Sequence, residues 1–339
     1  MVGIDDDPSR GQIVLVGALA IAFIVLGIVV VFNTSLYAEN VDSTGTVSSV
    51  NQAEQVRHAG GDSVAGVAYR VNQGEFDSNS TVAAAVNRNT SNFSAVWQSL
   101  YAQSQPSAVN ASLDGSNSEY GVRVFQSTDD DFRARADAGQ ENWNLTPSGA
   151  SPTYSDVGEF DVTLDRGSLD TTRTGAFHLA ALGGDGTGNE AWRVVWFVND
   201  SSRLDVYVAS GSDPTAPSGW ENQTGSQVCN DVSVGTDIEV DMVNGSIDGT
   251  SCSFEFTDDL SYVPGENGYA VQFVNGDNAT GQYDAHLSQT AFTIGSPVTG
   301  GPAPYYSHIV WEASVVVEYD SPTASYTRTV TVPVYNSTR

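Results

Sequence analysis

Lysine is absent from this 339-residue chain, and all 13 of its basic residues are arginine. They face 41 acidic residues, which leaves a formal net charge of −28. Binding to nucleic acid or to an anionic membrane surface requires many phosphates to be neutralised, so this composition excludes both as electrostatic partners. A disordered acidic tail is excluded as well, because 40% of the residues are hydrophobic and 10% are aromatic, enough to form buried cores.

The acidity has two interpretations. In the first, a charged surface keeps the protein soluble through self-repulsion. In the second, the chain is adapted to high salt, where dense counterions screen that repulsion. The complete absence of lysine favours the halophilic interpretation.

Motifs of catalysis and of transition-metal binding are also missing. The chain has no G-x-S-x-G nucleophile elbow and no Walker-type phosphate loop, and its four histidines show no metal-binding spacing. A triad distant in sequence, or a pair of glycosidase carboxylates, stays open because neither leaves a local signal. We therefore expect no enzyme, no catalytic residue and no cofactor, with a secreted hydrolase as an alternative.

Two oxygen-rich turns raise the question of calcium. They surround Asp185, in residues 183–190, and Asp277, in residues 275–281. Hard cations such as Ca²⁺ prefer oxygen ligands, but neither turn has the fixed acid spacing of an EF-hand loop. Calcium near Asp185 or Asp277 is therefore the alternative to a plain surface turn.

The N-terminus contains a candidate membrane-spanning segment. Residues Ile13 to Phe32 are twenty consecutive residues without a charge or a proline, and a helix of this length rises about 30 Å, one hydrocarbon thickness. The segment before them is acidic and no small-x-small pattern follows, so a retained helix is favoured over a cleaved signal peptide. Arg10 lies just before the run and Arg57 far beyond it, which predicts a cytoplasmic N-terminus and an exported body.

The residues Arg10-Gly11-Gln12-Ile13, immediately before this run, resemble the processing site of archaeal type IV prepilins. In that family a prepilin peptidase cuts after the small residue and leaves the hydrophobic helix on the mature protein. The resemblance thus implies a cut between Gly11 and Gln12. Val16 stands at the fifth mature position, where many bacterial pilins carry Glu, so strong registration between subunits is not implied.

Residues 10–41 as a whole also resemble the N-termini of uncharacterised haloarchaeal exported proteins of pilin-like type. The resemblance implies a protein held in the cell membrane by residues 13–32 with its C-terminal part outside, or one incorporated into an extracellular filament. Its implied partners are the membrane, prepilin peptidase, and pilin-like subunits of the same or another protein. An unprocessed single-pass anchor is the alternative.

Asparagine gives an independent indication of an exported protein. About a fifth of the residues are Ser or Thr, so chance would place about four of the 21 asparagines in N-x-Ser/Thr sequons, yet eleven lie in them. The excess indicates a glycosylated surface protein. The sequon residues are Asn33, Asn79, Asn89, Asn92, Asn110, Asn144, Asn199, Asn222, Asn244, Asn278 and Asn336.

Two helical segments are expected after the apolar run. Residues 36–70 have a loose helical period that the Gly60-Gly61 pair weakens, which predicts a stalk, whole or broken. Residues 81–108 have a clearer period, although Asn89–Asn92 interrupt it and leave two shorter helices as the alternative.

From Tyr120 onward the hydrophobic period changes to two. Recurrent short strands between turns rich in Gly, Asp, Asn, Ser and Pro predict an all-β sandwich or barrel. The expected strands are Tyr120–Gln126, Glu159–Leu164, Ala176–Leu182, Arg193–Val198, Arg203–Ala209, Ser226–Val234, Asp237–Val243, Ser251–Phe256, Tyr269–Val274, Tyr283–Leu287, His308–Tyr319 and Ala324–Val334.

The predicted fold class is α+β, with an N-terminal transmembrane or pilin-like helix, a short helical stalk and a mainly antiparallel all-β sandwich-like domain. We expect a leader at 1–11, the hydrophobic helix at 12–36, the stalk region at 37–118 and an extracellular part at 119–339, in one β domain or two. Residues 128–156 contain three consecutive Asp and few apolar residues, and mark a soft boundary as a linker or long loop.

Cys229 and Cys252 both lie on expected strands, far from any C-x-x-C motif. A cysteine pair exported to an oxidising compartment most often forms a disulfide, the alternative being two buried thiols. A bridge closing a loop of this length would stabilise the fold by about 3 kcal/mol in the chain-entropy model.

Aromatic residues cluster along one expected hairpin. Trp192, Trp196 and Tyr207 are core residues if they point inward, and a carbohydrate-binding platform if they are exposed together. The sequence therefore predicts a non-enzymatic cell-surface protein of type IV pilin-like class with a structural or interaction role. A membrane-anchored carbohydrate-binding or adhesin module is the alternative.

The net charge predicts that folding depends on the salt concentration. Folded structure should be lost as salt is lowered from molar to millimolar concentration, because the self-repulsion of a chain with net charge −28 is then no longer screened. Circular-dichroism melts across that salt series test this. A melting temperature that stays constant over the series would contradict the halophilic interpretation.

Overall fold

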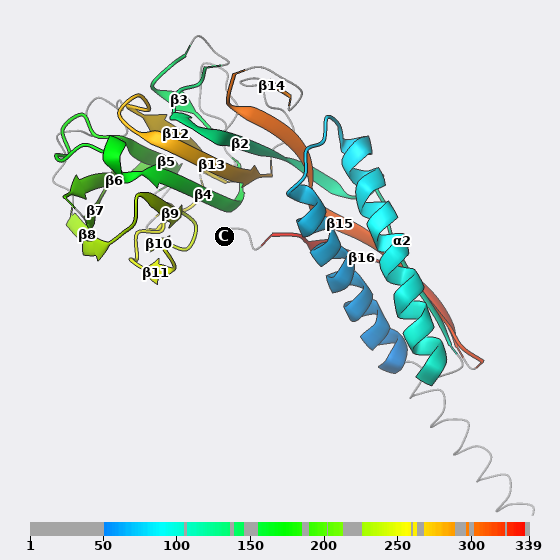
Figure 1. Ribbon diagram of the computed structural model, residues 1–339. Helices are drawn as coiled ribbons and strands as arrows, with labels where there is room; N and C mark the ends of the chain where they lie inside the picture. Colours follow the sequence, from blue (N-terminus) through cyan, green and yellow to red (C-terminus); the bar gives the residue numbers. More distant parts are fainter. Residues whose placement is uncertain are drawn as a thin grey trace, which may run out of the picture.

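The computed structural model describes residues 51–104, 107–135, 139–145, 155–184, 190–201, 203–212, 226–258, 260–262, 268–288, 296–297, 302–322 and 324–335. In these residues the chain forms two helices and mainly antiparallel strands, which confirms the α+β class and the sandwich-like domain (Figure 1). The expected membrane helix at 13–32 and the processing residues Arg10, Gly11, Gln12 and Ile13 lie outside the described residues. No helix in the described ranges is long and apolar enough to cross a membrane.

The sandwich consists of two sheets. In spatial order, the described strands of the smaller sheet are β3 (Trp143–Asn144), β12 (Ala270–Val274), β5 (His178–Gly184), β6 (Glu190–Asp200), β7 (Arg203–Ser212) and β8 (Ser226–Ser233). The described path of the larger sheet is β1 (Ala108–Leu113), β15 (Tyr305–Asp320), β2 (Glu119–Asp131), β13 (Thr280–Leu287), β4 (Val157–Asp165), β9 (Asp237–Asp241), β10 (Ser246–Ile247) and β11 (Thr250–Ser251). Two further strands pair with β15, namely β14 (Ser296–Pro297) and β16 (Ser325–Pro333).

Alternating apolar residues of the two sheets meet in one core. Along β4, for example, Phe160, Val162 and Leu164 are buried while Asp161 points outward. Aromatic rings fill the centre, and Phe132 stacks on Phe177 with ring centroids 4.7 Å apart. The disulfide between Cys229 and Cys252, the pairing expected from the sequence, lies in the same core.

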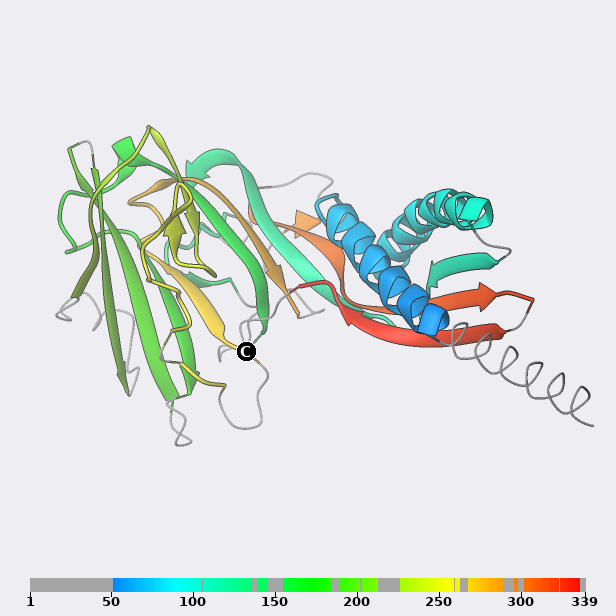
Figure 2. The same cartoon turned by 90° about the horizontal axis from the view of Figure 1, so that it is seen from below.

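A second unit, called the helical module here, has its own hydrophobic core. It consists of the helical residues 51–72, α2 (Asn79–Ser104), β1, β16 and the C-terminal half of β15. The two helices lie side by side over one face of the three strands (Figures 1 and 2). Buried valine and alanine from both helices contact buried residues of β1 and β15, the central members being Val56, Val64, Val86, Val109 and Val317.

The glycine pair that weakened the expectation of a stalk helix has a packing role. The helix is continuous through Gly60 and Gly61. A Cβ on Gly60 would lie 3.1 Å from both Trp97 and Val317, and one on Gly61 would lie 3.0 Å from Val332. Glycine therefore lets the helix approach the sheet closely, and α2 is likewise unbroken through Asn89–Asn92.

One pair of strands runs through both units. The C-terminal half of β15 pairs with β1 and its N-terminal half pairs with β2, so β1 and β2 lie end to end along the same side of β15. The five residues between them loop out, yet Asp114 still donates its backbone N–H to the Ser314 carbonyl at 2.7 Å. At about 3.3 Å per residue, the 16 residues of β15 span about 50 Å and join the helical module to the sandwich.

The structure corrects two boundaries. The helical region expected at 37–118 is not a separate stalk, because β1 lies within it and β15 and β16 return from the far end of the chain to complete it. Residues 128–156 are not a linker where they are described, since Phe132, Trp143 and Leu145 are buried in the sandwich core.

Most expected strands are confirmed, with shifted ends, as β2, β4 to β9, β12, β13, β15 and β16. The strand expected at Ser251–Phe256 is wrong beyond Ser251, and β1, β3, β10 and β14 were not expected. The helix expected at 81–108 ends at Ser104, and β1 begins at Ala108, so the last expected helical position is already a strand.

Candidate functional site

The aromatic residues expected as a possible platform do not form one. Trp192 and Trp196 are only 5% and 1% exposed. Tyr207 is half-buried, with the Arg173 guanidinium 5.0 Å from its ring centroid. A flat exposed aromatic surface is therefore missing at these three positions.

The sequon asparagines differ in how accessible their side-chain amides are. Asn199 and Asn278 are half-buried and donate these amides to the backbone carbonyls of Arg166 and Gly175, at 3.1 and 2.6 Å, so they are poorly placed for a glycan. Asn89, Asn92, Asn110 and Asn244 are exposed, Asn79 and Asn144 are half-buried, and Asn33, Asn222 and Asn336 lie outside the described residues.

The hypothesis of a calcium site near Asp185 or Asp277 receives little support. Asp185 lies outside the described residues, and Asp277 forms an ion pair with Arg133 at 3.0 Å. Within the described part of the chain, no group of three or more His, Cys, Asp or Glu side chains is arranged to hold a metal ion.

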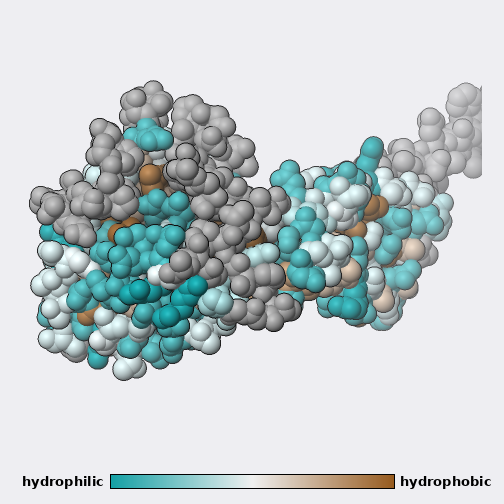
Figure 3. All heavy atoms as spheres, turned by 90° about the horizontal axis from the view of Figure 1, so that it is seen from above, coloured by the Kyte–Doolittle hydropathy of each residue, from teal (hydrophilic) through white to brown (hydrophobic). Residues whose placement is uncertain are grey.

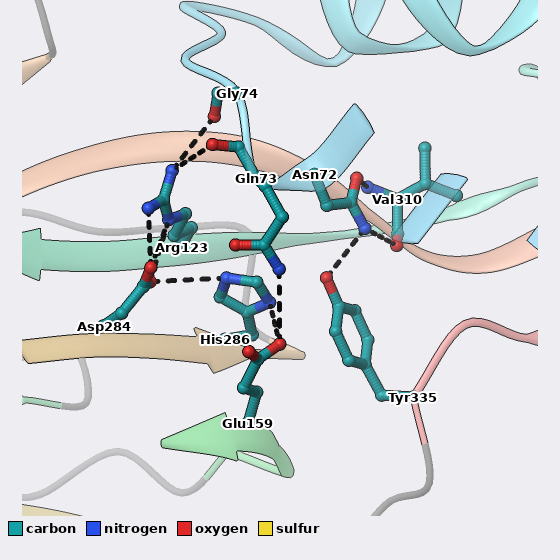
Figure 4. Close-up of polar contacts among 9 residues, drawn as sticks. All are labelled: Asn72, Gln73, Gly74, Arg123, Glu159, Asp284, His286, Val310 and Tyr335. Atoms are coloured by element: carbon teal, nitrogen blue, oxygen red, sulfur yellow. Dashed lines mark hydrogen bonds and ion pairs between the residues drawn. The ribbon is translucent and has the colours of Figure 1, made fainter. Parts of the chain in front are cut away.

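A polar network lies where the helical module meets the sandwich, and is called the junction cluster here. Its side chains come from the end of the first helix, from three strands of the larger sheet and from the residues after β16 (Figure 4). The members are Asn72, Arg123, Glu159, Asp284, His286 and Tyr335.

Asn72 fixes the end of the helix to β15. Its fully buried side chain accepts a hydrogen bond from the Val310 N–H at 2.9 Å and donates to the Val310 carbonyl at 2.8 Å. The same amide also donates to the Tyr335 hydroxyl at 2.8 Å. Val310 borders an irregularity in the pairing of β15 with β2, so the amide supplies backbone partners where the ladder shifts.

Arg123, on β2, connects the helix end to β13. Its Nε and Nη2 atoms donate to the Asp284 carboxylate at 2.5 to 2.9 Å, while Nη1 donates to the Gln73 carbonyl at 2.7 Å. A guanidinium is favourable there, because carbonyls at a helix C-terminus carry partial negative charge. Burial opposes the charged form of Asp284, but hydrogen bonds from His286 and Arg123 outweigh it and hold the pKa of this carboxyl below its usual range.

His286 lies between two carboxylates. Its side chain is completely buried, with Nε2 3.3 Å from Asp284 and Nδ1 3.3 Å from Glu159. The ring meets the Tyr335 ring edge-on with centroids 5.2 Å apart, and Tyr335 stacks on Trp311 at 5.0 Å. Helix, sheet and C-terminal residues thus share a single network.

A cavity of about 450 Å³ opens beside the cluster. Glu159, Asp161, Asp241, Tyr69 and Tyr335 are among its lining residues. Partial burial, together with the charges of Glu159, Asp241 and Asp284, raises the pKa of Asp161 to about 7. The wall is therefore acidic and carries a carboxyl that exchanges its proton near neutral pH.

This arrangement can hold two units in one orientation and can exchange protons at the cavity. Sequence reasoning missed the cluster because its members are far apart in the chain. Asp284 and His286 are two residues apart and so share one face of β13, which was the available local signal.

Comparisons with known proteins give one match. The model of a family of unknown function, DUF7261, matches residues 7–129, which include the apolar run, both helices, β1 and most of β2. No curated protein and no solved structure matches the chain.

Replacing Asn72 by leucine tests the junction. The variant would leave the Val310 N–H and carbonyl and the Tyr335 hydroxyl buried without this partner, so the free energy of unfolding should fall by about 2–4 kcal/mol. Denaturant titration at molar salt measures this. Gln73→Leu is the matched control, since this exposed neighbour makes only a 3.5 Å side-chain contact, with Glu159, in the described part of the chain, and equal losses in both variants would contradict the role of Asn72.

Asp161 should make stability depend on pH. Its folded-state pKa is above the unfolded value, so the folded state binds the proton more tightly and stability falls as pH rises from about 4 to about 7. Asp161→Asn should raise the free energy of unfolding at pH 8 by about 1 kcal/mol, the scale of partly exposed charge interactions. It should change little at pH 4.

Denaturant titrations at both pH values test this, with Asp62→Asn on the helical surface as the matched loss of one charge. Equal effects at pH 4 and pH 8, or equal effects of the two variants, would contradict the role of Asp161.

Proposed function

We propose that the protein is a non-enzymatic cell-surface protein of type IV pilin-like class. Residues 13–32 hold it in the membrane or in a filament, and the sandwich projects outside on the helical module. The apolar run, the Arg10-Gly11-Gln12-Ile13 site and the excess of sequons support this proposal. The family match covers the apolar run and both helices together, as expected if the anchor and the helical module belong to one unit.

The observation that carries the proposal is the connection between the helix and the sandwich. The helix that follows the apolar run in sequence packs on β15 and β16, and β15 continues into the sandwich. The junction cluster adds hydrogen bonds between the same helix end and β2 and β15, and Arg123 of β2 pairs in turn with Asp284 of β13. An anchor attached to this helix would therefore support the sandwich through continuous hydrogen-bonded structure rather than through a flexible linker.

The structure bears differently on the two alternative functions, a carbohydrate-binding module and a secreted hydrolase. A carbohydrate-binding module loses its expected platform, because Trp192 and Trp196 are buried. A hydrolase gains one observation, since Glu159, Asp161 and Asp241 line one cavity and the pKa of Asp161 suits a general acid or base near pH 7. Loss of a hydrolytic activity in the Asp161→Asn variant would support a hydrolase, whereas the expected gain in stability follows from the raised pKa with either function.

N-terminal processing is the direct test. In cells with prepilin peptidase, the mature chain is expected to begin at Gln12 and to lack residues 1–11, as measured by the intact mass of protein extracted from membranes. Gly11→Val should block the cut, because the peptidase of the resembled family requires a small residue there. Gly3→Val, the same change within the leader, is the control, and an intact Met1 in the wild-type chain would overturn processing.

A further inference from the structure

Charge is distributed unevenly between the two units. Residues 129–304, which contain most of the sandwich, carry 27 acids and six arginines, a net charge of −21. Residues 51–128 and 305–339, which contain the helical module, carry nine acids and six arginines, a net charge of −3. Two copies approaching through their sandwiches repel one another, whereas two approaching through their helical modules meet little opposing charge.

Within the module, the long helix α2 carries very little charge for its length. No acid lies between Asp77 and Asp114, a stretch in which the average acid content of this chain would place about four. The single charge on the 26-residue helix is Arg88. A solvent-facing helix without acids is at odds with the acidic surface that this chain has elsewhere.

The exposed side of α2 also carries apolar side chains. Val96 is 61% exposed and Leu100 is 59% exposed, and they stand one turn apart on the same face. Ala95 and Ser99 are exposed beside them and are small enough for another backbone to come close. Apolar side chains are visible on the surface of the helical module in Figure 3. The four residues Ala95, Val96, Ser99 and Leu100 are called the α2 patch.

We propose that the α2 patch is the surface on which a second copy of this chain packs side by side in the same membrane or filament. The inference rests on the proposed function and adds the contact surface to it. The two helices of the module run antiparallel, so the C-terminal half of α2 lies at the same end as residue 51 (Figure 1). Copies anchored through residues 13–32 stand parallel and present this patch to one another at equal height.

A contact of this kind suits the solvent indicated by the composition. At molar salt the screening length is about 3 Å, so the distant sandwiches repel weakly while apolar contact at the patch is unaffected by screening. Pairing through the same patch on both copies places each residue near its own equivalent, as in any two-fold interface. A single introduced cysteine can therefore report the contact.

Cross-linking in native membranes at molar salt tests the proposal. The two natural cysteines are joined in the disulfide, so Val96→Cys or Leu100→Cys adds the reactive thiol. A short bismaleimide should then yield covalent dimers. Thr329→Cys, exposed on the opposite face of the module's sheet, is the matched control and should stay monomeric. Equal dimer yields from the three variants, or none from the first two, would overturn the proposal.

A second set of variants tests whether cross-linking depends on apolar contact at the α2 patch. Adding Leu100→Glu to Val96→Cys should reduce the dimer about tenfold or more, because a carboxylate would be buried without a partner, whereas Thr329→Glu should leave it unchanged. Unchanged melting curves show that both variants fold. Two further results would overturn the proposal. One is quenching of a probe at Val96 by brominated lipid in the absence of dimers. The other is the appearance of dimers only after Asn92→Gln removes a glycan.

Membrane fractionation of the same samples separates the two proposals. Protein that remains with the membrane but fails to cross-link contradicts the α2 patch and leaves the proposed function intact. Protein absent from both the membrane and any filament fraction contradicts the proposed function itself.

Discussion

The backbone ladder of β15 is the constraint on which the rest of the molecule depends. One strand of 16 residues pairs with β1 and β16 beneath the helices and with β2 inside the larger sheet. Because each hydrogen bond in a ladder fixes its neighbours, the register set in the sandwich also sets the position of the strand beneath the helices. The core of the sandwich and the core of the helical module are thereby held in one orientation.

The junction cluster completes this connection at a polar site. A fully buried amide, a buried histidine, a guanidinium and two carboxylates would each be costly to bury alone. Here Asn72 pairs with the Val310 backbone, Arg123 with Asp284, and His286 lies between Asp284 and Glu159. Such a network favours one geometry, since any displacement of the helix end would leave charged or polar atoms without partners.

The net charge differs between the two units of the fold, the sandwich and the helical module. The sandwich carries most of the net charge. The helical module is nearly neutral and has apolar side chains on its surface. The helical module therefore differs from the sandwich both in net charge and in the apolar side chains that α2 exposes.

Residue pattern alone predicted much of the local structure. The change of hydrophobic period near Tyr120 and most strands followed from local spacing, since alternation and turn residues act over a few positions. The Cys229–Cys252 disulfide followed from the presence of a single cysteine pair. Gly60 and Gly61 were misread because helix propensity is local, whereas their reason is the nearness of Trp97, Val317 and Val332. Burial of Trp192 and Trp196 was likewise undecided, because the sequence shows that a strand has an aromatic face but not what covers it.

By itself, the sequence determined the charge, the apolar run at 13–32, the resemblance of its processing site and the class of fold. Only the tertiary structure decided that the C-terminal strands return to complete the helical module, and that Asn72, Arg123, Asp284 and His286 meet. The physical reason is separation along the chain. Asn72 and Val310 are 238 residues apart, and strand pairing over such distances is selected by the whole set of contacts that form together.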